Sequence, residues 1–372
     1  MEVEVAKFRD ALEIVRPAVP RKSALPAITH VLLGNGQIVG GDLESAVIVS
    51  LPGAQDPCLL PIEAVIQLLK YIPGSQRMTL EVKRGKVNIT WPEGSATFSA
   101  DNPKDYPPVP GITVTAEADI AGDSLIEAIS SVLPYCATEQ TRPVLSGITV
   151  VLGESIQVCA GDGFRMAYES IPLAFPLAQT IVIPATGAKL MLHLWAKTPR
   201  TPPSSNDLIP VITAKKKLAV ALADGNILRV GFGPAAQVLI KLIQGSPPDW
   251  LKLIPTTPPI LQARVLAPDF ERAVKRVRDV ARDGKGIVRL QFSEASMTVS
   301  SKADSNVIEA VVPLVNSEGE PNKTAVNVNY LLGYLSGKQG IVTISLTSTT
   351  SPVSFQHRSS PRVIVMPMFV EW

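Results

Sequence analysis

The chain has 372 residues, of which 46% are apolar and 18% charged, and its formal net charge is +2. This composition supplies several hydrophobic cores and excludes disordered and fibrous classes. Residues 1–5 carry acids where a secretory signal would carry base, and no apolar run reaches the roughly 18 residues that a membrane helix needs. The cysteines, Cys58, Cys136 and Cys159, are odd in number and far apart, so we expect neither disulfides nor a metal site, and a cytoplasmic location.

Amphipathic helices are predicted in pairs, one pair in each third of the chain. Their apolar residues recur every three or four positions, as Phe8, Leu12 and Val15 do in the opening helix. Three of the predicted helices begin at a proline, at Pro61, Pro184 and Pro268, which suits a first helical turn. The remaining predicted helices cover residues 61–71, 121–133, 184–195, 268–282 and 327–335.

Runs rich in β-branched and aromatic residues predict strands between these helices. They cover residues 78–82, 86–91, 217–221, 227–232, 288–292 and 341–346. Residues 34–36, 83–85 and 224–226 have the composition of hairpin turns. This order of elements favours an α+β fold in which helices cover one face of antiparallel sheet.

An aliphatic-proline pair recurs at Leu51-Pro52, Ile171-Pro172 and Val312-Pro313, each time ahead of a loop, an apolar run and a helix. The spacings of about 120 and 140 residues indicate one ancestral domain present in three copies. Proline-rich stretches at residues 102–110 and 245–259 mark boundaries. We therefore predict domains at residues 1–110, 111–255 and 256–372, with residues 198–207 as an insertion.

Signatures of catalysis are weak. His30, His193 and His357 lack metal-ligand spacing, and Gly161-Asp162-Gly163 lacks the third glycine of a dinucleotide loop. An enzyme acting on DNA would need a nucleophile or a metal constellation, and neither is present in the sequence pattern. We expect a protein that is not an enzyme and has no cofactor.

One predicted helix is apolar on one side and basic on the other. Phe270, Val274 and Val277 form its apolar side. The basic side carries Arg272, Lys275, Arg276 and Arg278. Such a face is either a solvated surface or a contact for phosphates, and the pattern alone leaves both interpretations open.

Four segments, in order along the chain, carry a resemblance to a known family. They are Leu25-Pro26-Ala27-Ile28 with Gly41-Asp42-Leu43-Glu44; Arg142-Pro143-Val144-Leu145-Ser146-Gly147 with Gly161-Asp162-Gly163-Phe164-Arg165-Met166; Pro248-Asp249-Trp250; and Val363-Ile364-Val365-Met366-Pro367-Met368. Together they span nearly the whole chain and resemble the sliding clamp family, the beta subunits of bacterial DNA polymerase III.

The resemblance implies three tandem clamp domains, with two helices on antiparallel sheet in each, and a head-to-tail homodimeric ring around duplex DNA. Such a ring tethers the replicative polymerase for processive synthesis. Implied partners are double-stranded DNA of any sequence, a second copy of the chain, a clamp loader, and replicative and repair polymerases that insert short linear peptides; no membrane is involved. The alternative is a clamp-fold scaffold that binds peptides but closes no ring.

The resemblance also implies a partner-peptide pocket. Its lining would be Leu145, Gly161, Gly163, Phe164, Arg165, Met166, Pro248, Leu253, Pro352, Ile364 and Met366. Gly161, Phe164 and Pro352 depart from the family pattern, so we expect a differently shaped pocket. A further hypothesis is that residues 369–372, which extend beyond the usual family ending, pack at the pocket rim.

For DNA binding, the positions that match the family are Arg21, Lys22, Lys70, Arg142 and Lys252. Periodicity adds the basic face formed by Arg272, Lys275, Arg276 and Arg278. Glu63, Ala185 and His193 stand where the family is basic, so positive charge is expected to shift toward the third domain. At the dimer interface, Phe98 falls on the family's apolar contact in the first domain. Val280 lies near its counterpart in the third domain, but Asp279 is charged where an apolar residue is expected.

Overall fold

The computed structural model describes residues 1–83, 85–139, 141–197, 217–358 and 361–372. Contacts divide the chain into two compact units. Unit 1 comprises Met1–Ser130, Val151–Ile156 and Ile171–Gln244, and unit 2 comprises Ser131–Val150, Gln157–Ser170 and Gly245–Trp372. The predicted insertion at 198–207, and residue 84 of one predicted turn, lie outside the described residues. The division into three domains stays a prediction.

Unit 1 is built on two sheets. The eight-stranded sheet has the order β5-β2-β3-β4-β16-β15-β14-β9. Its strands are β2 (Val31–Gly34), β3 (Gln37–Gly41), β4 (Ser45–Ser50), β5 (Cys58–Leu60), β9 (Val114–Ala121), β14 (Lys217–Ala223), β15 (Ile227–Phe232) and β16 (Ala236–Lys241). The four-stranded sheet consists of β1 (Glu2–Glu4), β6 (Arg77–Lys83), β7 (Lys86–Trp91) and β8 (Gly94–Ser99), in the order β1-β6-β7-β8. Strand β13 (Gln179–Pro184) also belongs to this unit.

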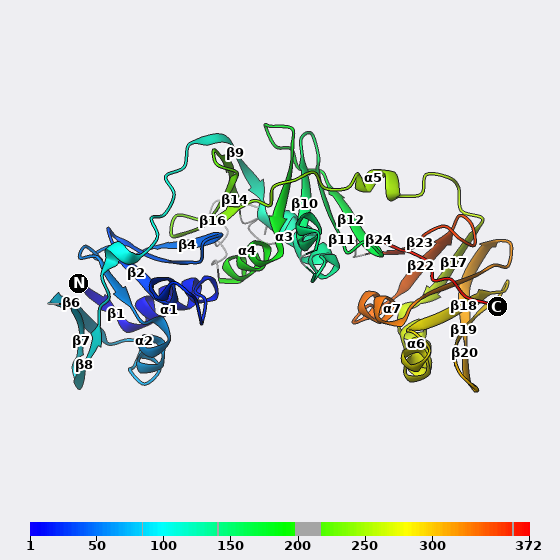
Figure 1. Ribbon diagram of the computed structural model, residues 1–372, viewed down its shortest axis with the longest axis horizontal. Coiled ribbons are helices and arrows are strands. Elements are labelled where there is room, and N and C mark those ends of the chain that lie inside the picture. The colour runs from blue at the N-terminus through cyan, green and yellow to red at the C-terminus, as the bar shows by residue number, and fades with distance from the viewer. Residues whose placement is uncertain (84, 140, 198–216, 359–360) are drawn as a thin grey trace, which may run out of the picture. The chain divides into compact units, whose positions relative to one another are not determined.

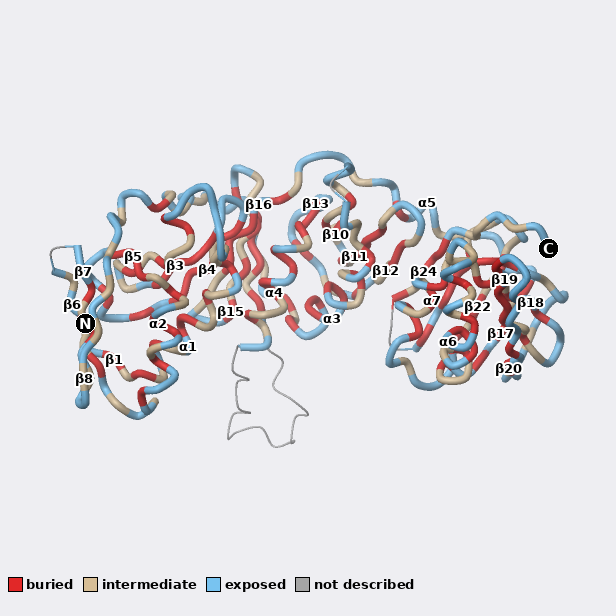
Figure 2. The backbone as a smooth tube through the Cα atoms, turned by 60° about the horizontal axis from the view of Figure 1, so that its bottom comes forward, coloured by how far each residue is buried: buried red, intermediate tan, exposed pale blue. Residues whose placement is uncertain are grey.

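Helices cover one face of these sheets (Figure 1). They are α1 (Val5–Val15), α2 (Ile62–Leu69), α3 (Gly122–Val132), whose end passes into unit 2, and α4 (Ala185–Lys197). Phe8, Leu12 and Val15 are buried where α1 packs on β3, β4 and α2. Figure 2 shows the same pattern along the chain, with buried residues in the strands and along one side of each helix. The predicted apolar stripes therefore form the core.

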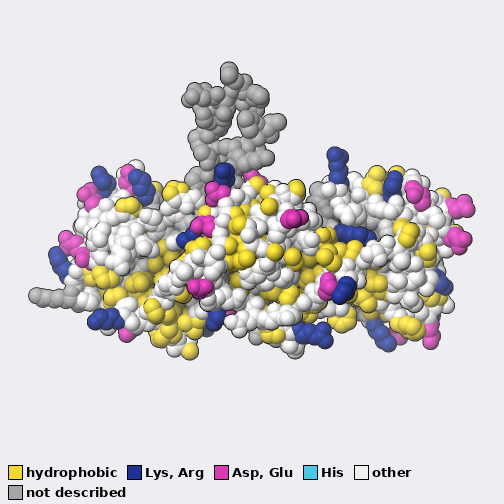
Figure 3. Space-filling model, turned by 90° about the horizontal axis from the view of Figure 1, so that it is seen from above, with side chains coloured by type: hydrophobic (Ala, Val, Ile, Leu, Met, Phe, Trp, Pro, Cys, Tyr) yellow, Lys and Arg dark blue, Asp and Glu magenta, His cyan; other side chains and the backbone are white. Residues whose placement is uncertain are grey.

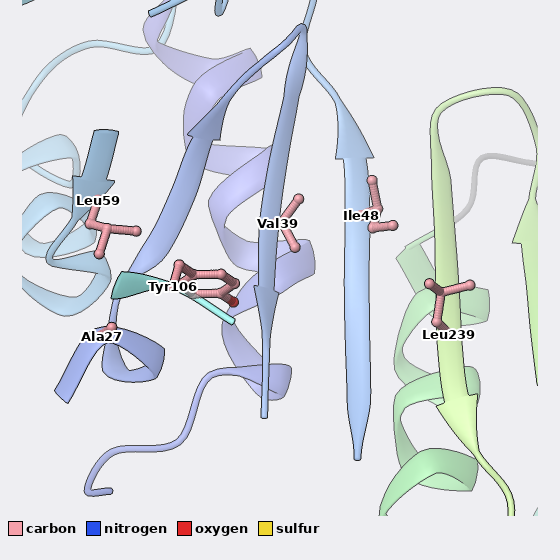
Figure 4. Close-up of a cluster of buried hydrophobic side chains, with 6 residues drawn as sticks. All are labelled: Ala27, Val39, Ile48, Leu59, Tyr106 and Leu239. Carbon is pink, nitrogen blue, oxygen red and sulfur yellow. The ribbon is translucent and has the colours of Figure 1, made fainter. Parts of the chain in front are cut away.

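The proline-rich stretch predicted as a boundary covers the other face of the eight-stranded sheet. Tyr106, only 8% exposed, packs in a cluster with Val39 and Ile48 of neighbouring strands. In Figure 4 the ring lies between Leu59 of β5 and Val39 of β3, and Ala27 and Leu239 complete the cluster. Burial raises the pKa of Tyr106 to about 12. The part of the sheet beneath this cluster is thus buried on both faces, which explains the apolar runs in β3 and β4.

Unit 2 contains one long antiparallel sheet, in which β12 continues through the order β24-β23-β22-β17-β20-β19-β18-β21. Its strands are β12 (Arg165–Ile171), β17 (Leu261–Leu266), β18 (Ile287–Phe292), β19 (Ser296–Ala303), β20 (Asn306–Gly319), β21 (Lys323–Asn327), β22 (Ile341–Leu346), β23 (Val353–His357) and β24 (Arg362–Val365). Strand β11 (Ile156–Gly161) lies beside β12, and β10 (Gly147–Leu152) lies beside β11. Helices α6 (Ala267–Asp283) and α7 (Val328–Leu335) pack on each other and on this sheet.

The predicted helices all form, and each lies within a few residues of its predicted bounds. A further single turn, α5 (Trp250–Leu253), was not predicted because four residues carry no measurable periodicity. The α+β class and the antiparallel sheets are confirmed. No helix in the described part of the chain has the length and apolar character to cross a membrane.

The third aliphatic-proline pair differs from the first two. Leu51 and Ile171 lie at the ends of their strands, whereas Val312-Pro313 lies inside the long strand β20. Residues up to Pro313 pair with β19, and from Leu314 onward the strand pairs with β17, across a shift in register. Proline cannot donate to a ladder, so it marks the point where β20 exchanges one partner for another.

The cluster in Figure 4 leads to a stability prediction. Replacing Tyr106 by alanine leaves a cavity under the covering segment and should lower the free energy of unfolding by about 3 kcal/mol. Tyr71→Ala is the matched control, because this tyrosine is 86% exposed and its loss should cost less than about 0.5 kcal/mol. Urea unfolding followed by fluorescence measures both. Equal effects of the two substitutions would contradict the assigned packing.

Candidate functional site

The turn between β11 and β12 is fixed by Asp162. Its Oδ1 accepts hydrogen bonds from the backbone N–H groups of Phe164 and Arg165, both at 3.0 Å. The Asp162 N–H in turn donates to the Arg165 carbonyl at 3.1 Å. Gly163 has a φ of +96°, which a residue with a side chain rarely adopts. This turn places Phe164 outside and Arg165 at the start of β12.

The Arg165 guanidinium is held entirely by groups of unit 2. Its Nε donates to Asp162 Oδ2 at 3.0 Å, and one terminal nitrogen donates to the Pro134 carbonyl at 3.1 Å. Its central carbon, Cζ, lies over the rings of Tyr135 and Tyr330, at 5.0 and 4.7 Å from their centroids. Burial raises the pKa of Tyr135 to about 12, against the opposing effect of the arginine charge. The side chain predicted to line a pocket therefore ties β12 to α7.

A compact apolar cluster lies beneath this turn. Leu145, Met166 and Ile364, all predicted as pocket lining, are each at most 5% exposed and pack together with Cys159 and Trp250. These residues come from different elements. Met166 and Ile364 meet because β12 pairs with β24 in a register that sets them opposite each other. The sequence prediction thus brought together residues that are neighbours in space, although these three form a buried floor.

Other predicted residues are exposed around that floor. Phe164, Leu253 and Met366 expose 65%, 50% and 49% of their surface. The Met366 N–H donates to the Phe164 carbonyl at 2.8 Å, which holds these two side by side. Leu253 is carried by α5, and the first residue of this helix, Trp250, packs in the buried cluster together with Ile254, which follows the helix. We call Phe164, Leu253 and Met366 the apolar patch. Exposed apolar side chains over a rigid apolar floor are typical of a docking surface.

The remaining predicted residues take peripheral positions. Gly161 ends β11, Gly163 lies in the turn, and Pro248 is exposed just before α5. Pro352 precedes β23, whose Val353 pairs with Val365, so it lies at the same strand end as Met366. Sequence reasoning missed Tyr135, Tyr330 and the structural role of Trp250. The tryptophan belongs to a segment that carried the resemblance, but no local pattern connects the two tyrosines to Arg165.

The hypothesis that the chain end packs at the rim of this site is wrong. The Met368 N–H donates to the Ala325 carbonyl of β21 at 2.7 Å. Lys323 lies 4.7 Å over the Trp372 ring, and the Arg289 guanidinium is 3.4 Å from the Glu371 carbonyl. Residues 371 and 372 therefore lie against β18 and β21. Phe369 is 97% exposed and covers nothing.

The basic residues predicted for DNA are on the surface of both units. Arg21 and Lys22 are exposed in the loop after α1, and Lys70 caps α2 and donates to Gln67 at 3.2 Å. In unit 2, Arg142 is exposed, and Lys252 on α5 pairs with Asp249 at 3.0 Å. This hydrogen bond lowers the pKa of Asp249.

The basic face of α6 is largely balanced by its own acids. Arg272 pairs with Asp269, Lys275 with Glu271 at 2.9 Å, and Arg278 with Asp279 at 3.1 Å. Arg276 is exposed, and within the described ranges no acid lies in ion-pair reach of it. The helix therefore presents less net positive potential than its basic residues alone would indicate. On the face of the molecule that Figure 3 shows, basic and acidic side chains are interspersed, with no continuous patch of either sign.

Unit 1 shows the same balancing. Glu63, acidic where the resemblance implied a base, accepts two hydrogen bonds from Arg16, both at 2.8 Å. The His193 ring lies 3.2 Å from the Glu13 carbonyl, and Lys197 pairs with the Glu13 carboxylate at 3.1 Å. Within the part of the chain that the structure describes, no group of histidine, cysteine and acidic residues could hold a metal ion.

The predicted dimer residues lie beside open sheet edges. Phe98 is half-buried on β8, the outermost strand of the four-stranded sheet. Val280 is half-buried on α6, which packs on β20. In the described chain, the second half of β20 pairs with β17, whereas the first half of β20 has no partner on that side. The edge of this first half is therefore open, and its Val307 and Val311 are exposed. Open edges of this kind are templates for pairing with another chain.

Comparison with known proteins gives one consistent result. Residues 252–369 match the family described as DNA polymerase III beta subunit, C-terminal domain. The chain is 22% identical over 393 residues to the beta sliding clamp of Caulobacter vibrioides, covering 99% of this chain and 96% of the relative. The crystal structure of DNA polymerase III beta subunit from Thermotoga maritima superposes with a TM-score of 0.86 at 18% identity, covering 100% of this chain and 99% of that one.

Residues 252–369 therefore match the C-terminal domain of the DNA polymerase III beta subunit family, and the chain as a whole has the fold of the solved beta subunits. A Pseudomonas aeruginosa sliding clamp, DNA polymerase III subunit beta, crystallised with griselimycin is also similar, with a TM-score of 0.84 at 20% identity, covering 100% of this chain and 99% of that one. Within this chain, Leu253, Ile364 and Met366 lie in the segment that matches the family's C-terminal domain. The turn with Phe164 and Arg165 lies before that segment, so the candidate site combines residues from inside and outside the matched segment.

The environment of Arg165 predicts that it is a structural tie. Arg165→Gln removes the contacts of the guanidinium with two rings and also removes one ion pair. The substitution should therefore lower the free energy of unfolding of unit 2 by about 2 kcal/mol. Lys252→Gln is the matched control, because Lys252 also pairs with an acid three residues earlier but is 83% exposed. It should cost less than about 0.5 kcal/mol. Hydrogen exchange of α7 and urea unfolding measure both; similar losses would refute the assignment.

Proposed function

We propose that this protein is a DNA sliding clamp that encircles duplex DNA and tethers a replicative polymerase, without catalytic activity of its own. The observation that carries the proposal is the end-to-end match, 99% of the chain, with a protein named beta sliding clamp. The fold agrees over the full length with solved beta subunits. The proposal places the protein in the cytoplasm, where bacterial DNA is replicated.

The open edges support a head-to-tail homodimer. Strand β8 of one protomer would pair with the first half of β20 of its partner, and the reverse pairing would close the ring. Alternation along β20 buries Ala310 and Val312 toward α6, the side on which Val280 lies. Phe98 points to the half-buried side of its own edge strand. Pairing of the edges would bring Phe98 and Val280 together on the helix side of the joined sheet.

The balanced charges support a loose hold on DNA. Exposed Arg21, Lys22, Lys70, Arg142, Lys252 and Arg276 would contact phosphates, which carry no sequence information. Because Arg272, Lys275 and Arg278 already pair with acids, few counterions would be released on binding. The ring would then be retained by topology and could slide on any sequence.

The apolar patch is the proposed attachment point for polymerases, repair polymerases and the clamp loader through short linear peptides. Phe164, Leu253 and Met366 offer apolar contact area, and Arg165 keeps the surrounding elements in place. A griselimycin complex is known for the similar Pseudomonas aeruginosa clamp. A peptide with apolar anchor side chains fits such a patch better than a charged ligand does.

Retention on DNA tests the proposed function. The protein is incubated with a bacterial clamp loader, ATP and plasmid DNA, and bound protein is separated by gel filtration. We expect retention on circular plasmid that is lost when the plasmid is cut, because a closed ring leaves only through a DNA end. Equal retention on circular and linear plasmid would reduce the activity to ordinary electrostatic binding.

A second outcome distinguishes the alternative function. A clamp-fold scaffold that closes no ring would remain a monomer in sedimentation and be retained on neither plasmid, yet it would bind apolar peptides. That combination would refute ring closure but would agree with peptide binding at the apolar patch.

The proposed ring edge gives a further prediction. Phe98→Ser should weaken dimerisation at least tenfold, because a buried aromatic contact at the centre of an interface contributes more than about 1.4 kcal/mol. Phe369→Ser is the matched control: the residue type is the same, but 97% of its surface is exposed. Sedimentation velocity over a dilution series gives both dissociation constants. An unchanged constant for Phe98→Ser would place the interface elsewhere.

A further inference from the structure

We infer that Gly161 and Trp250 form a size-matched pair that holds α5 in position and thereby sets the width of the apolar patch. The inference deepens the proposed peptide-binding function and rests on it. Neither residue contributes a side chain to the exposed patch, because Gly161 has none and Trp250 is only 6% exposed.

Gly161 is a glycine because of space and not because of its backbone conformation. Its φ is not in the left-handed region, so any residue could adopt it. A Cβ added there would lie 2.8 Å from Cζ3 and 2.9 Å from Cη2 of Trp250, and 2.9 Å from the Arg165 carbonyl oxygen. Real Cβ atoms essentially never approach other atoms below 3.0 Å. The indole therefore occupies the volume that a side chain at position 161 would need.

The indole cannot move away without loss. Its Nε1–H donates to Thr149 Oγ1 at 3.0 Å, and Thr149 is 1% exposed on β10. A shift of the ring would break this bond between buried polar groups and leave both unsatisfied. The ring also packs against Leu145, Cys159 and Met166 in the buried cluster. Trp250 is thus held on one side by a hydrogen bond and on the other by close contact with Gly161.

The position of α5 depends on this anchorage. A helix of four residues has too few hydrogen bonds to be stable alone, so tertiary contacts must place it. Trp250 begins the turn and Ile254 follows it, and both pack on the buried cluster. Between them Leu251 and Leu253 are about half exposed, at 48% and 50%. The indole therefore sets how far Leu253 lies from Phe164 and Met366.

A side chain at position 161 would consequently act at a distance. It would displace the indole, move α5 outward and change the separation of the apolar anchors that a peptide contacts. Trimming Trp250 to phenylalanine would free part of that volume. The two substitutions should therefore compensate each other, which unrelated substitutions in one cluster would not do.

The test compares Gly161→Ala, Trp250→Phe and the double variant. Hydrogen exchange of residues 249–254 reports the position of α5 without reference to function. Fluorescence anisotropy with labelled heptapeptides bearing leucine and phenylalanine anchors reports the patch. Gly111→Ala is the matched control, because a Cβ there meets nothing within 4 Å. Retention on circular plasmid, measured alongside, shows whether each variant still folds and closes.

In Gly161→Ala we expect exchange in residues 249–254 to accelerate and peptide affinity to fall about tenfold. Both effects should be partly reversed in the double variant, because the contact with the Arg165 carbonyl remains and Trp250→Phe removes the hydrogen bond to Thr149. Gly111→Ala should match the parent protein. Unchanged exchange in Gly161→Ala would overturn the pairing itself. Faster exchange with unchanged affinity would overturn its role in the patch. Absence of peptide binding by the parent protein would refute the proposed peptide function, while the exchange data would still decide the pairing.

Discussion

The antiparallel pairing of β12 with β24 is the contact on which unit 2 depends. It joins strands that are far apart in the chain and sets Met166 opposite Ile364 and Arg165 opposite Val365. Alternation of side chains then divides the roles: Met166 and Ile364 form the buried floor, and Arg165 faces the tyrosines. One residue beyond the last pair, the Met366 N–H meets the Phe164 carbonyl. A slip of one residue would invert every one of these positions.

The sequence predicted the elements better than it predicted their contacts. Stripes such as Phe8, Leu12 and Val15 identify a helix because burial and periodicity are local properties. The residues of the candidate site were found through resemblance, but resemblance did not separate the buried Ile364 from the half-exposed Met366. The stacking of Arg165 on Tyr330 was not predictable, because it depends on a pairing between distant strands. Short elements such as α5 are not predicted from the sequence for a different reason, because their geometry is set by one anchor residue.

Charge counted along the sequence overstates the positive potential of the surface. In α6 the acids stand three or four residues before Arg272 and Lys275, which is the spacing of ion pairs on a helix. Glu63 is likewise matched by Arg16 through two hydrogen bonds. Such pairs add little stability, but they shorten the reach of each charge. For a protein proposed to move along DNA, this balance weakens the attraction to the phosphate backbone, while a few unpaired cations remain for contact.

The path of the chain end has a consequence for solubility. In the described chain, β21 is the last strand of its sheet, and a bare last strand would offer hydrogen-bonding groups to any passing polypeptide. The Met368 N–H binds Ala325 on that strand, and the Lys323 ammonium covers the terminal indole of Trp372. These contacts shield one end of the sheet and leave the first half of β20 as its exposed edge. A molecule that assembles through strand edges benefits when the edge that takes no part in the assembly is covered. Two competing edges would favour open-ended fibres over a defined assembly.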